Sequence, residues 1–187
     1  MTKRMCFIGN CQVMGLCDYI ANTPDQPNCR WLCTIDKWHT ESKWPKCIEQ
    51  FGQKQIDRNI FDKKKILELL IHSDYVIYQP NFYHNQTVNI ALKKNTHLIP
   101  ITLSPIFVND LQYIIKKEKK YNCNILCSEI IKNNKDHKLY INRDNHPTTF
   151  LLLEIAKQIC DITKISFYTN NDYEKLLKVQ YPNYLHR

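Results

Sequence analysis

Residues 6–19 read CFIGNCQVMGLCDY, a stretch that predicts a strand turning directly into a helix. The apolar run Cys6–Ile8 follows two basic residues, which is typical of a short buried strand. Gly9 interrupts this run, and the apolar residues after it recur at helical spacing. We therefore expect the turn Gly9–Gln12 at the carboxyl end of a strand and the amino end of a helix.

A turn of this kind is suited to chemistry, because ligands of open α/β sheets bind at the carboxyl ends of the strands. The N–H groups and the positive dipole end of a helix hold an oxyanion or phosphate, and they lower the pKa of a nearby thiol. Cys11 is thus a candidate nucleophile, and Gly9, Asn10 and Gln12 are candidates for oxyanion or substrate binding. The alternative is that Cys11 is a small buried apolar residue and Gly9 only forms the turn.

The composition fits a single folded domain over residues 1–187. Hydrophobic residues make up 43% of the chain, and no apolar run approaches the ~20 residues that span a membrane. The start of the chain is basic, but the apolar stretch behind it is too short for a secretory signal. Nine cysteines without such a signal favour reduced thiols over disulfides. We therefore expect a cytoplasmic protein with no membrane span.

The net charge of +8 predicts attraction to an acidic partner, for which nucleic acid, a nucleotide-sugar and coenzyme A are the candidates. The two basic runs, 63–65 and 116–120, lie beside apolar residues at helical spacing. Both are interpreted as solvated helix faces. No zinc-knuckle spacing points to nucleic acid, so we expect no nucleic-acid partner.

Strands and helices alternate along the rest of the chain. Strands are predicted at 29–35, 74–78 and 97–102, with shorter strand patterns at 138–141 and 164–168. Helices are predicted at 61–72, 85–94, 108–120, 148–160 and 173–179, and a long loop at 36–55. This alternation predicts βαβ units, hence an α/β fold of three α/β/α layers around a mainly parallel sheet.

Two further loops are expected at the same edge of the sheet as the first turn. The loop 79–84, QPNFYH, follows the third strand, and the loop 143–147, RDNHP, precedes the helix 148–160. Pro147 suits the first helical position, which would hold His146 at the helix start. The loop 79–84 contributes Gln79 and His84 as candidate substrate-binding residues, although His84 also fits a structural histidine.

A cysteine and a histidine on separate loops, with a nearby carboxylate, form the arrangement that nucleophilic or general-base acyl chemistry needs. His146 is the candidate base, and Asp144 is the candidate carboxylate that fixes its tautomer. Asn10 or Asn81 would donate to an oxyanion. The alternative for His146 is a helix-capping or surface histidine.

The GNCQ tetrapeptide at 9–12, the loop 79–81 and the His146–Pro147 pair resemble the WcbI-type polysaccharide biosynthesis proteins. The resemblance implies acetyltransferases that bind coenzyme A and a three-layer, SGNH/flavodoxin-like fold. By position, it implies that Cys11 replaces the nucleophilic serine of SGNH esterases, that Asn81 is the oxyanion asparagine, and that His146 is the histidine of the last block. SGNH enzymes place Asp three residues before this histidine, whereas Asp144 stands two before it.

The leading hypothesis is an enzyme that transfers an acetyl group from acetyl-CoA to a hydroxyl or amine of a nucleotide-sugar or glycan, in polysaccharide biosynthesis. Acetyl-CoA or coenzyme A is then the only cofactor expected, without a metal. The alternative is an SGNH-like esterase or deacetylase that hydrolyses an acyl group from a glycan.

A third hypothesis is a non-enzymatic binding module. The pairs Cys29/Cys33 and Cys123/Cys127 offer thiols for zinc, but close zinc pairs usually have two intervening residues. Cys29 and Cys33 are moreover predicted on one strand, about 13 Å apart.

Overall fold

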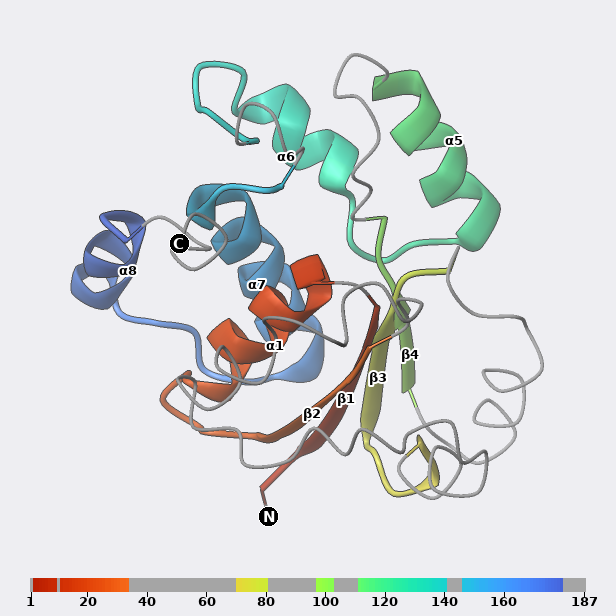
Figure 1. Ribbon diagram of the computed structural model, residues 1–187, viewed down its shortest axis with the longest axis vertical. Coiled ribbons are helices and arrows are strands. Elements are labelled where there is room, and N and C mark those ends of the chain that lie inside the picture. Colours follow the sequence, from red (N-terminus) through yellow and green to blue (C-terminus); the bar gives the residue numbers. More distant parts are fainter. Residues whose placement is uncertain are drawn as a thin grey trace, which may run out of the picture.

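The computed structural model describes residues 2–9, 11–33, 70–80, 97–102, 111–140 and 146–179. Within these ranges the centre of the fold is a parallel sheet of four strands in the order β2-β1-β3-β4 (Figure 1). The strands are β1 (Arg4–Gly9), β2 (Asn28–Cys33), β3 (Tyr75–Tyr78) and β4 (His97–Pro100). The register pairs Met5 of β1 with Cys29 on one side and Tyr75 on the other.

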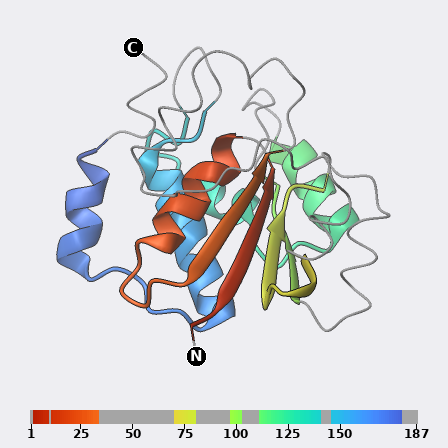
Figure 2. The ribbon, with the colours of Figure 1, turned by 60° about the horizontal axis from the view of Figure 1, so that its bottom comes forward.

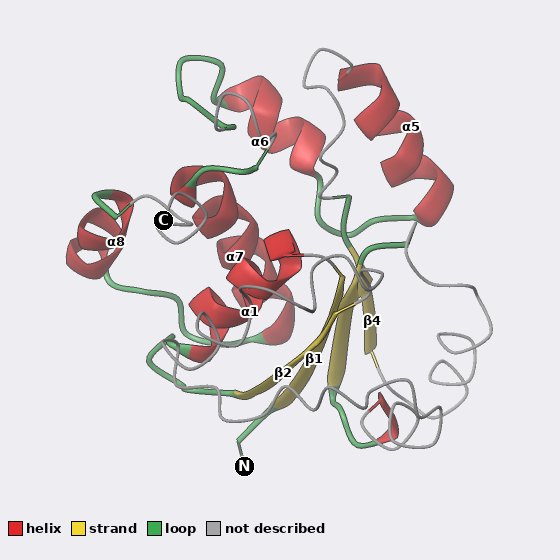
Figure 3. Cartoon of the chain, in the orientation of Figure 1, coloured by secondary structure: helices red, strands yellow, loops and turns green. Residues whose placement is uncertain are grey.

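Helices cover this sheet and extend beyond its carboxyl edge (Figure 3). Those within the described ranges are α1 (Cys11–Ala21), α5 (Leu111–Tyr121), α6 (Cys127–Asn133), α7 (Thr149–Thr163) and α8 (Asn170–Leu177). Helices α1 and α7 pack together along one face of the sheet, and α5 and α6 lie toward the carboxyl ends of the strands (Figures 1 and 2). None of these helices is long and apolar enough to cross a membrane.

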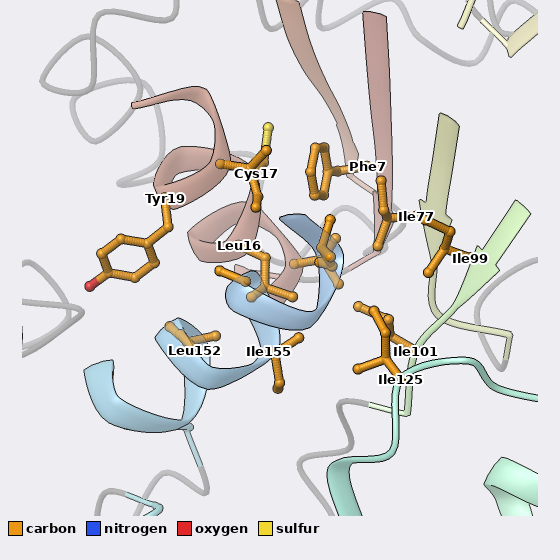
Figure 4. Close-up of a cluster of buried hydrophobic side chains, with 14 of the residues drawn as sticks. Phe7, Leu16, Cys17, Tyr19, Ile77, Ile99, Ile101, Ile125, Leu152 and Ile155 are labelled. Carbon is orange, nitrogen blue, oxygen red and sulfur yellow. The ribbon is translucent and has the colours of Figure 1, made fainter. Parts of the chain in front are cut away.

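Alternation along β1 divides its buried side chains between two faces. Phe7 joins Ile77 in the larger cluster, which also includes Leu16 of α1 and Leu152 of α7 (Figure 4). Cys6, Ile8 and Val76 face the other way and pack with Leu70, which is itself helical. Both faces of the central strand are therefore covered, as in a parallel sheet between two helical layers. The predicted three-layer α/β/α fold is confirmed.

Both of the shorter strand predictions are wrong for the residues that the structure describes, 138–140 and 164–168. In the segment 164–168, Ile165 is buried, but its N–H donates to the Cys160 carbonyl as part of the α7 C-cap. The Ser166 N–H donates to the Asp25 carboxylate, 2.7 Å away, instead of to a neighbouring strand. In the segment 138–141, Tyr140 makes only an isolated antiparallel bridge with Pro147. Proline has no N–H for a ladder, and α7 begins soon after it.

Several boundaries differ from the predictions, and some predictions fall outside the described residues. Helix α6 was not predicted, α7 runs to Thr163, and α8 begins at Asn170 rather than Tyr173. Only residues 70–72 of the predicted helix 61–72 are described; residues 70 and 71 are helical, and His72 is in the turn that follows. The predicted loop 36–55 and helix 85–94 lie outside the described residues.

Candidate functional site

The strand order creates a switch point between β1 and β3. From β1 the chain passes through α1 to β2 on one side, and it later returns to β3 on the other side of β1. In open α/β sheets, ligands bind in the crevice at the carboxyl ends of the two strands where the order reverses. Here those ends are Gly9 of β1 and Tyr78 of β3, with Gln79 directly after it.

Gly9 and Gln79 meet at this switch point. The Gln79 N–H donates to the Ile8 carbonyl at 3.0 Å, which continues the pairing of β3 with β1. A Cβ atom added to Gly9 would lie 2.5 Å from the side-chain oxygen of Gln79 and 2.5 Å from Cγ2 of Val13. Only glycine permits this close approach, which brings the Gln79 amide, 2% exposed, against the end of β1.

Trp31 of β2 contacts the carboxyl end of β1 from the side opposite to β3. Its indole N–H donates to the Gly9 carbonyl at 3.2 Å, and the residue is 4% exposed. A buried indole needs such an acceptor, so the hydrogen bond orients the peptide that leads into the turn. Sequence analysis did not single out Trp31. The sequence did contain a signal for this contact: a tryptophan inside a short apolar strand, whose indole N–H needs a hydrogen-bond acceptor when it is buried.

The amino end of α1 begins immediately beyond Gly9. Cys11 is the first residue of α1, so a single residue separates the helix from the last residue of β1. The N–H groups of a first helical turn point out along the axis and carry a partial positive charge. The predicted strand–turn–helix is therefore confirmed, although Cys11 and Gln12, expected in the turn, are already the first residues of α1. The dipole of this helix points at the switch point. Gln12, in this first turn, is buried.

His146 lies in a segment that is anchored just before α7. Thr148 caps the helix by accepting from the Leu151 N–H, and its hydroxyl donates to the Lys138 carbonyl at 2.8 Å. The Thr148 N–H donates to the Leu139 carbonyl at 2.9 Å. Pro147 was predicted at the first helical position, but it lies two residues before α7, because Thr148 takes the cap. His146, partly buried, stands one residue earlier still.

The orientation of α7 puts this segment at the carboxyl edge of the sheet. At its far end, the Thr163 and Lys164 carbonyls accept hydrogen bonds from the Lys3 ammonium, just before β1 begins. The last turn of α7 is thus held at the amino edge of the sheet, and its first turn points toward the opposite edge (Figure 1). His146 and the switch point therefore lie toward the same end of the sheet.

Other predicted site residues are not placed. Asn10, Asn81, His84 and Asp144 lie outside the described residues. Among the residues that are described, no group of three or more His, Cys, Asp or Glu side chains is arranged to hold a metal ion.

A buried carboxylate, Glu118 of α5, borders this edge of the sheet. The residue is 4% exposed, and it accepts from the Thr102 hydroxyl at 3.2 Å, the Ser128 N–H at 2.9 Å and the Ser128 hydroxyl. Burial, followed by the charge of Glu118, raises the pKa values of Cys123 and Cys127 to about 12. Sequence analysis missed Glu118 because it lies within a run of lysines. The signal in the sequence was helical spacing: Glu118 stands four residues after Ile114, so the two residues lie on one face of the helix, and both are buried.

Comparison with solved structures finds a similar fold in WcbI, a polysaccharide biosynthesis enzyme. The match covers 92% of this chain and 72% of the other, with a TM-score of 0.56 and 13% sequence identity. That structure is of the native WcbI protein without a disulfide bond between coenzyme A and one of its cysteines. No family model and no curated protein matches the sequence. The resemblance to WcbI-type proteins, inferred from short motifs, is confirmed at the level of the fold.

Proposed function

We propose that the protein is an acetyltransferase that moves an acetyl group from acetyl-CoA to a hydroxyl or amine of a sugar. The observation that carries this proposal is the turn from β1 into α1, which directs a helix dipole at the switch point. The similar fold belongs to a polysaccharide biosynthesis enzyme, described in its native form without a disulfide bond between coenzyme A and a cysteine, and this mention of coenzyme A supports the choice of donor.

The residues at the switch point fit the thioester end of such a donor. The first turn of α1 favours negative charge, and the Gln79 side-chain amide lies beside it, against the end of β1. The chain's charge of +8 suits the phosphates of coenzyme A. When bound, acetyl-CoA supplies the activated acyl group.

In this mechanism His146 takes the proton from the acceptor hydroxyl or amine, a contribution of about 10²–10⁴-fold in rate. The negative charge that develops on the carbonyl oxygen is stabilised by the first turn of α1 together with Asn10 or Asn81, each donor worth about 3 kcal/mol. Asp144 fixes the His146 tautomer. Gln12, Gln79 and His84 bind substrate. His146 finally returns the proton to the departing thiolate.

Cys11 has one of two roles in this scheme. It forms an acyl thioester, or it positions the donor carbonyl for direct transfer to the sugar. A thiol at a helix amino terminus has a lowered pKa, which suits the first role. Iodoacetamide labelling that is strongest at Cys11, and that acetyl-CoA prevents, is expected in either case. Mass spectrometry of the protein after acetyl-CoA alone distinguishes the two, because only the first leaves an acetyl group on Cys11.

Thermal unfolding with acetyl-CoA, coenzyme A and ATP is the first test. Selective binding to the folded protein stabilises it by about 2.7 kcal/mol at a hundredfold excess over the dissociation constant. A shift with both coenzymes but not with ATP supports a transferase. Equal shifts with all three indicate a general polyanion site, and no shift favours the esterase or deacetylase.

A second test separates catalysis from binding. His146→Ala should abolish acetyl transfer and keep the shift with coenzyme A. His72→Ala is the matched control, because this exposed histidine stands just before β3, at the opposite edge of the sheet. Full activity of the His146→Ala variant contradicts the assigned role.

A further inference from the structure

Helix α5 is strongly basic on its exposed side. Its sequence, LQYIIKKEKKY, places four lysines within five positions, 116–120. At 100° per residue these lysines spread over an arc of about 160°, with Glu118 opposite the centre of the arc. Ile114 and Glu118 are the buried residues of this helix. The single carboxylate of the run is therefore turned inward, and the outward arc carries only positive charge.

The inward carboxylate accepts hydrogen bonds from Thr102 and Ser128, and it forms no ion pair with the described lysines beside it. Lys116 and Lys119 form no ion pair with any described residue. This arrangement differs from the usual helix surface, where Glu and Lys alternate at spacings of three and four and pair with each other.

Aromatic rings accompany these charges. The Lys117 ammonium lies 4.4 Å from the centre of the Tyr113 ring, and the Lys120 ammonium lies 5.1 Å from the centre of the Tyr121 ring. Such contacts hold a flexible lysine over a ring face. On the helical projection Tyr113 falls within the lysine arc, so the surface combines fixed cations with an aromatic ring.

The basic arc begins close to the candidate site. Burial, with the nearby Cys123 and Tyr121, raises the pKa of Tyr78, which places the end of α5 near the last residue of β3. Figure 1 likewise shows the α5 terminus near the carboxyl end of β3. Gln79, which contacts Gly9, is the next residue. A chain-like substrate held at the switch point could therefore continue onto α5.

From this placement we propose that α5 binds the acidic groups of a glycan acceptor, so that the substrate is a carboxylated, sulfated or phosphorylated saccharide. The four lysines between positions 116 and 120 span about 6 Å along the helix axis, which matches one or two sugar units rather than a long nucleic-acid backbone. Lysines supply the charge, and a tyrosine ring supplies a flat surface for the apolar face of a sugar. The identity of the ligand as an acceptor rests on the proposed function.

The test compares oligosaccharide binding to two variants with equal charge. The first changes the four α5 lysines to glutamine, and the second changes four exposed lysines in α6, in α7, in α8 and at the C-cap of α8. The substitutions in the first are Lys116→Gln, Lys117→Gln, Lys119→Gln and Lys120→Gln. The substitutions in the second are Lys132→Gln, Lys157→Gln, Lys175→Gln and Lys178→Gln. Exposed Lys-to-Gln changes leave folding nearly unaffected, and thermal unfolding of each variant checks this.

Calorimetry at low salt would use a hexamer of galacturonic acid as the probe, with maltohexaose as its neutral counterpart. We expect the α5 variant to bind the acidic hexamer about tenfold or more weakly, with a shallower salt dependence. The second variant should lose about twofold or less, since its charges lie farther from the arc. Equal losses in both variants, or equal binding of the acidic and neutral hexamers, overturn the proposal. So does tighter, α5-dependent binding of a single-stranded DNA hexamer.

Saccharide binding and the thermal shift with coenzymes are separate measurements, so the acidic-glycan proposal and the transferase proposal can fail independently of each other. Acidic-saccharide binding without a coenzyme shift would keep the glycan surface and reject the transferase. A coenzyme shift without acidic-saccharide binding would keep the transferase and reject the acidic acceptor.

Discussion

Gly9 is required by contact rather than by backbone conformation. The two atoms nearest a new Cβ come from different elements, Val13 of α1 and Gln79 after β3, and each would lie at 2.5 Å. A methyl group at this position must push the first turn of α1 or the Gln79 amide away. The first turn of α1 and Gln79 both belong to the proposed site, so even a small displacement of either should lower activity.

Gly9→Ala should lower the free energy of unfolding by about 1–3 kcal/mol, the usual cost of overpacking. Since Gln79 contributes one of the two contacts, adding Gln79→Ala should recover part of this loss. The measurement is a double-mutant cycle by urea unfolding, with Gln79→Ala alone as the control. Strictly additive effects would contradict a direct contact between the two residues.

Asp18 of α1 should make stability depend on pH in the acidic range. Burial raises its pKa from 3.8 to about 7, against the opposing effect of a hydrogen bond from Asn22. Between these pH values the folded protein holds a proton that the unfolded chain has lost. Stability therefore falls as pH rises from about 4 to 7, and then levels off.

Asp18→Asn should remove this dependence, because asparagine has a similar shape and no charge. At pH 8 we expect the variant to be more stable by about 1–2 kcal/mol, a reduced value because the carboxyl is partly exposed. At pH 4 the two proteins should be equal. Urea midpoints at both pH values make the comparison, and a variant that is less stable at pH 8 would rule out the penalty assigned to this carboxyl.

At the scale of elements, α6 depends on a cap from another helix. Its N-cap residue, Leu126, provides no side-chain hydrogen bond, and the Ser128 N–H instead donates to Glu118 of α5. Glu118→Gln replaces one acceptor oxygen by an amide group that cannot accept. The expected loss is about 1–3 kcal/mol, with faster hydrogen exchange in the first turn of α6.

Glu129→Gln is the matched control for this change. Glu129 lies in the first turn of the same helix but is exposed, so its substitution should cost about 0.5 kcal/mol or less. Equal losses for the two variants would show that α6 responds to charge alone and not to the buried hydrogen bonds.

The cap that Glu118 provides for α6 also illustrates why some elements could be predicted from the sequence and others could not. The strands β1, β3 and β4 and the helix α7 carry their signal locally, in apolar runs and helical spacing. Helix α6 has seven residues and receives its cap from a residue eight positions before its N-cap, so no local pattern marks its start. The segment 164–168 has the composition of a strand, but its backbone is bound by Asp25 and by the end of α7.

The candidate site, too, could be predicted from the sequence only in part. The sequence predicted the position of the Gly9–Gln12 turn, because a strand that ends at glycine before a helical pattern has few alternatives. It did not predict that Trp31 and Gln79 would secure that turn, since both contacts arise from strand neighbours distant in the chain. Side-chain hydrogen bonds between elements follow from the topology, which the sequence pattern determines only coarsely.

At the scale of the whole molecule, the proposed reactive thiol of Cys11 contrasts with five described cysteines whose thiol pKa values are raised. Burial contributes to the raised pKa values of the thiols of Cys6, Cys29, Cys123, Cys127 and Cys160. For Cys29 the first cause is its hydrogen bond with Cys17, and burial follows. A thiol that stays protonated is a poor nucleophile. The fold thus protects these sulfurs from the acyl chemistry proposed at the carboxyl edge of the sheet.

These buried thiols should make the protein sensitive to alkali. In the unfolded chain thiols ionise near the reference pKa of 9.0, whereas the buried ones remain protonated at that pH. The unfolded state then binds fewer protons, so stability falls as pH rises above about 9, by up to about 1.4 kcal/mol per pH unit for each thiol. Urea unfolding at pH 7.5, 8.5 and 9.5 in the presence of a reductant measures the slope. Cys123→Ala removes the most exposed of these thiols, so it should reduce the slope of stability against pH by the contribution of one thiol. A free energy of unfolding that stays constant up to pH 9.5 would contradict the inference that these thiols stay protonated in the folded protein.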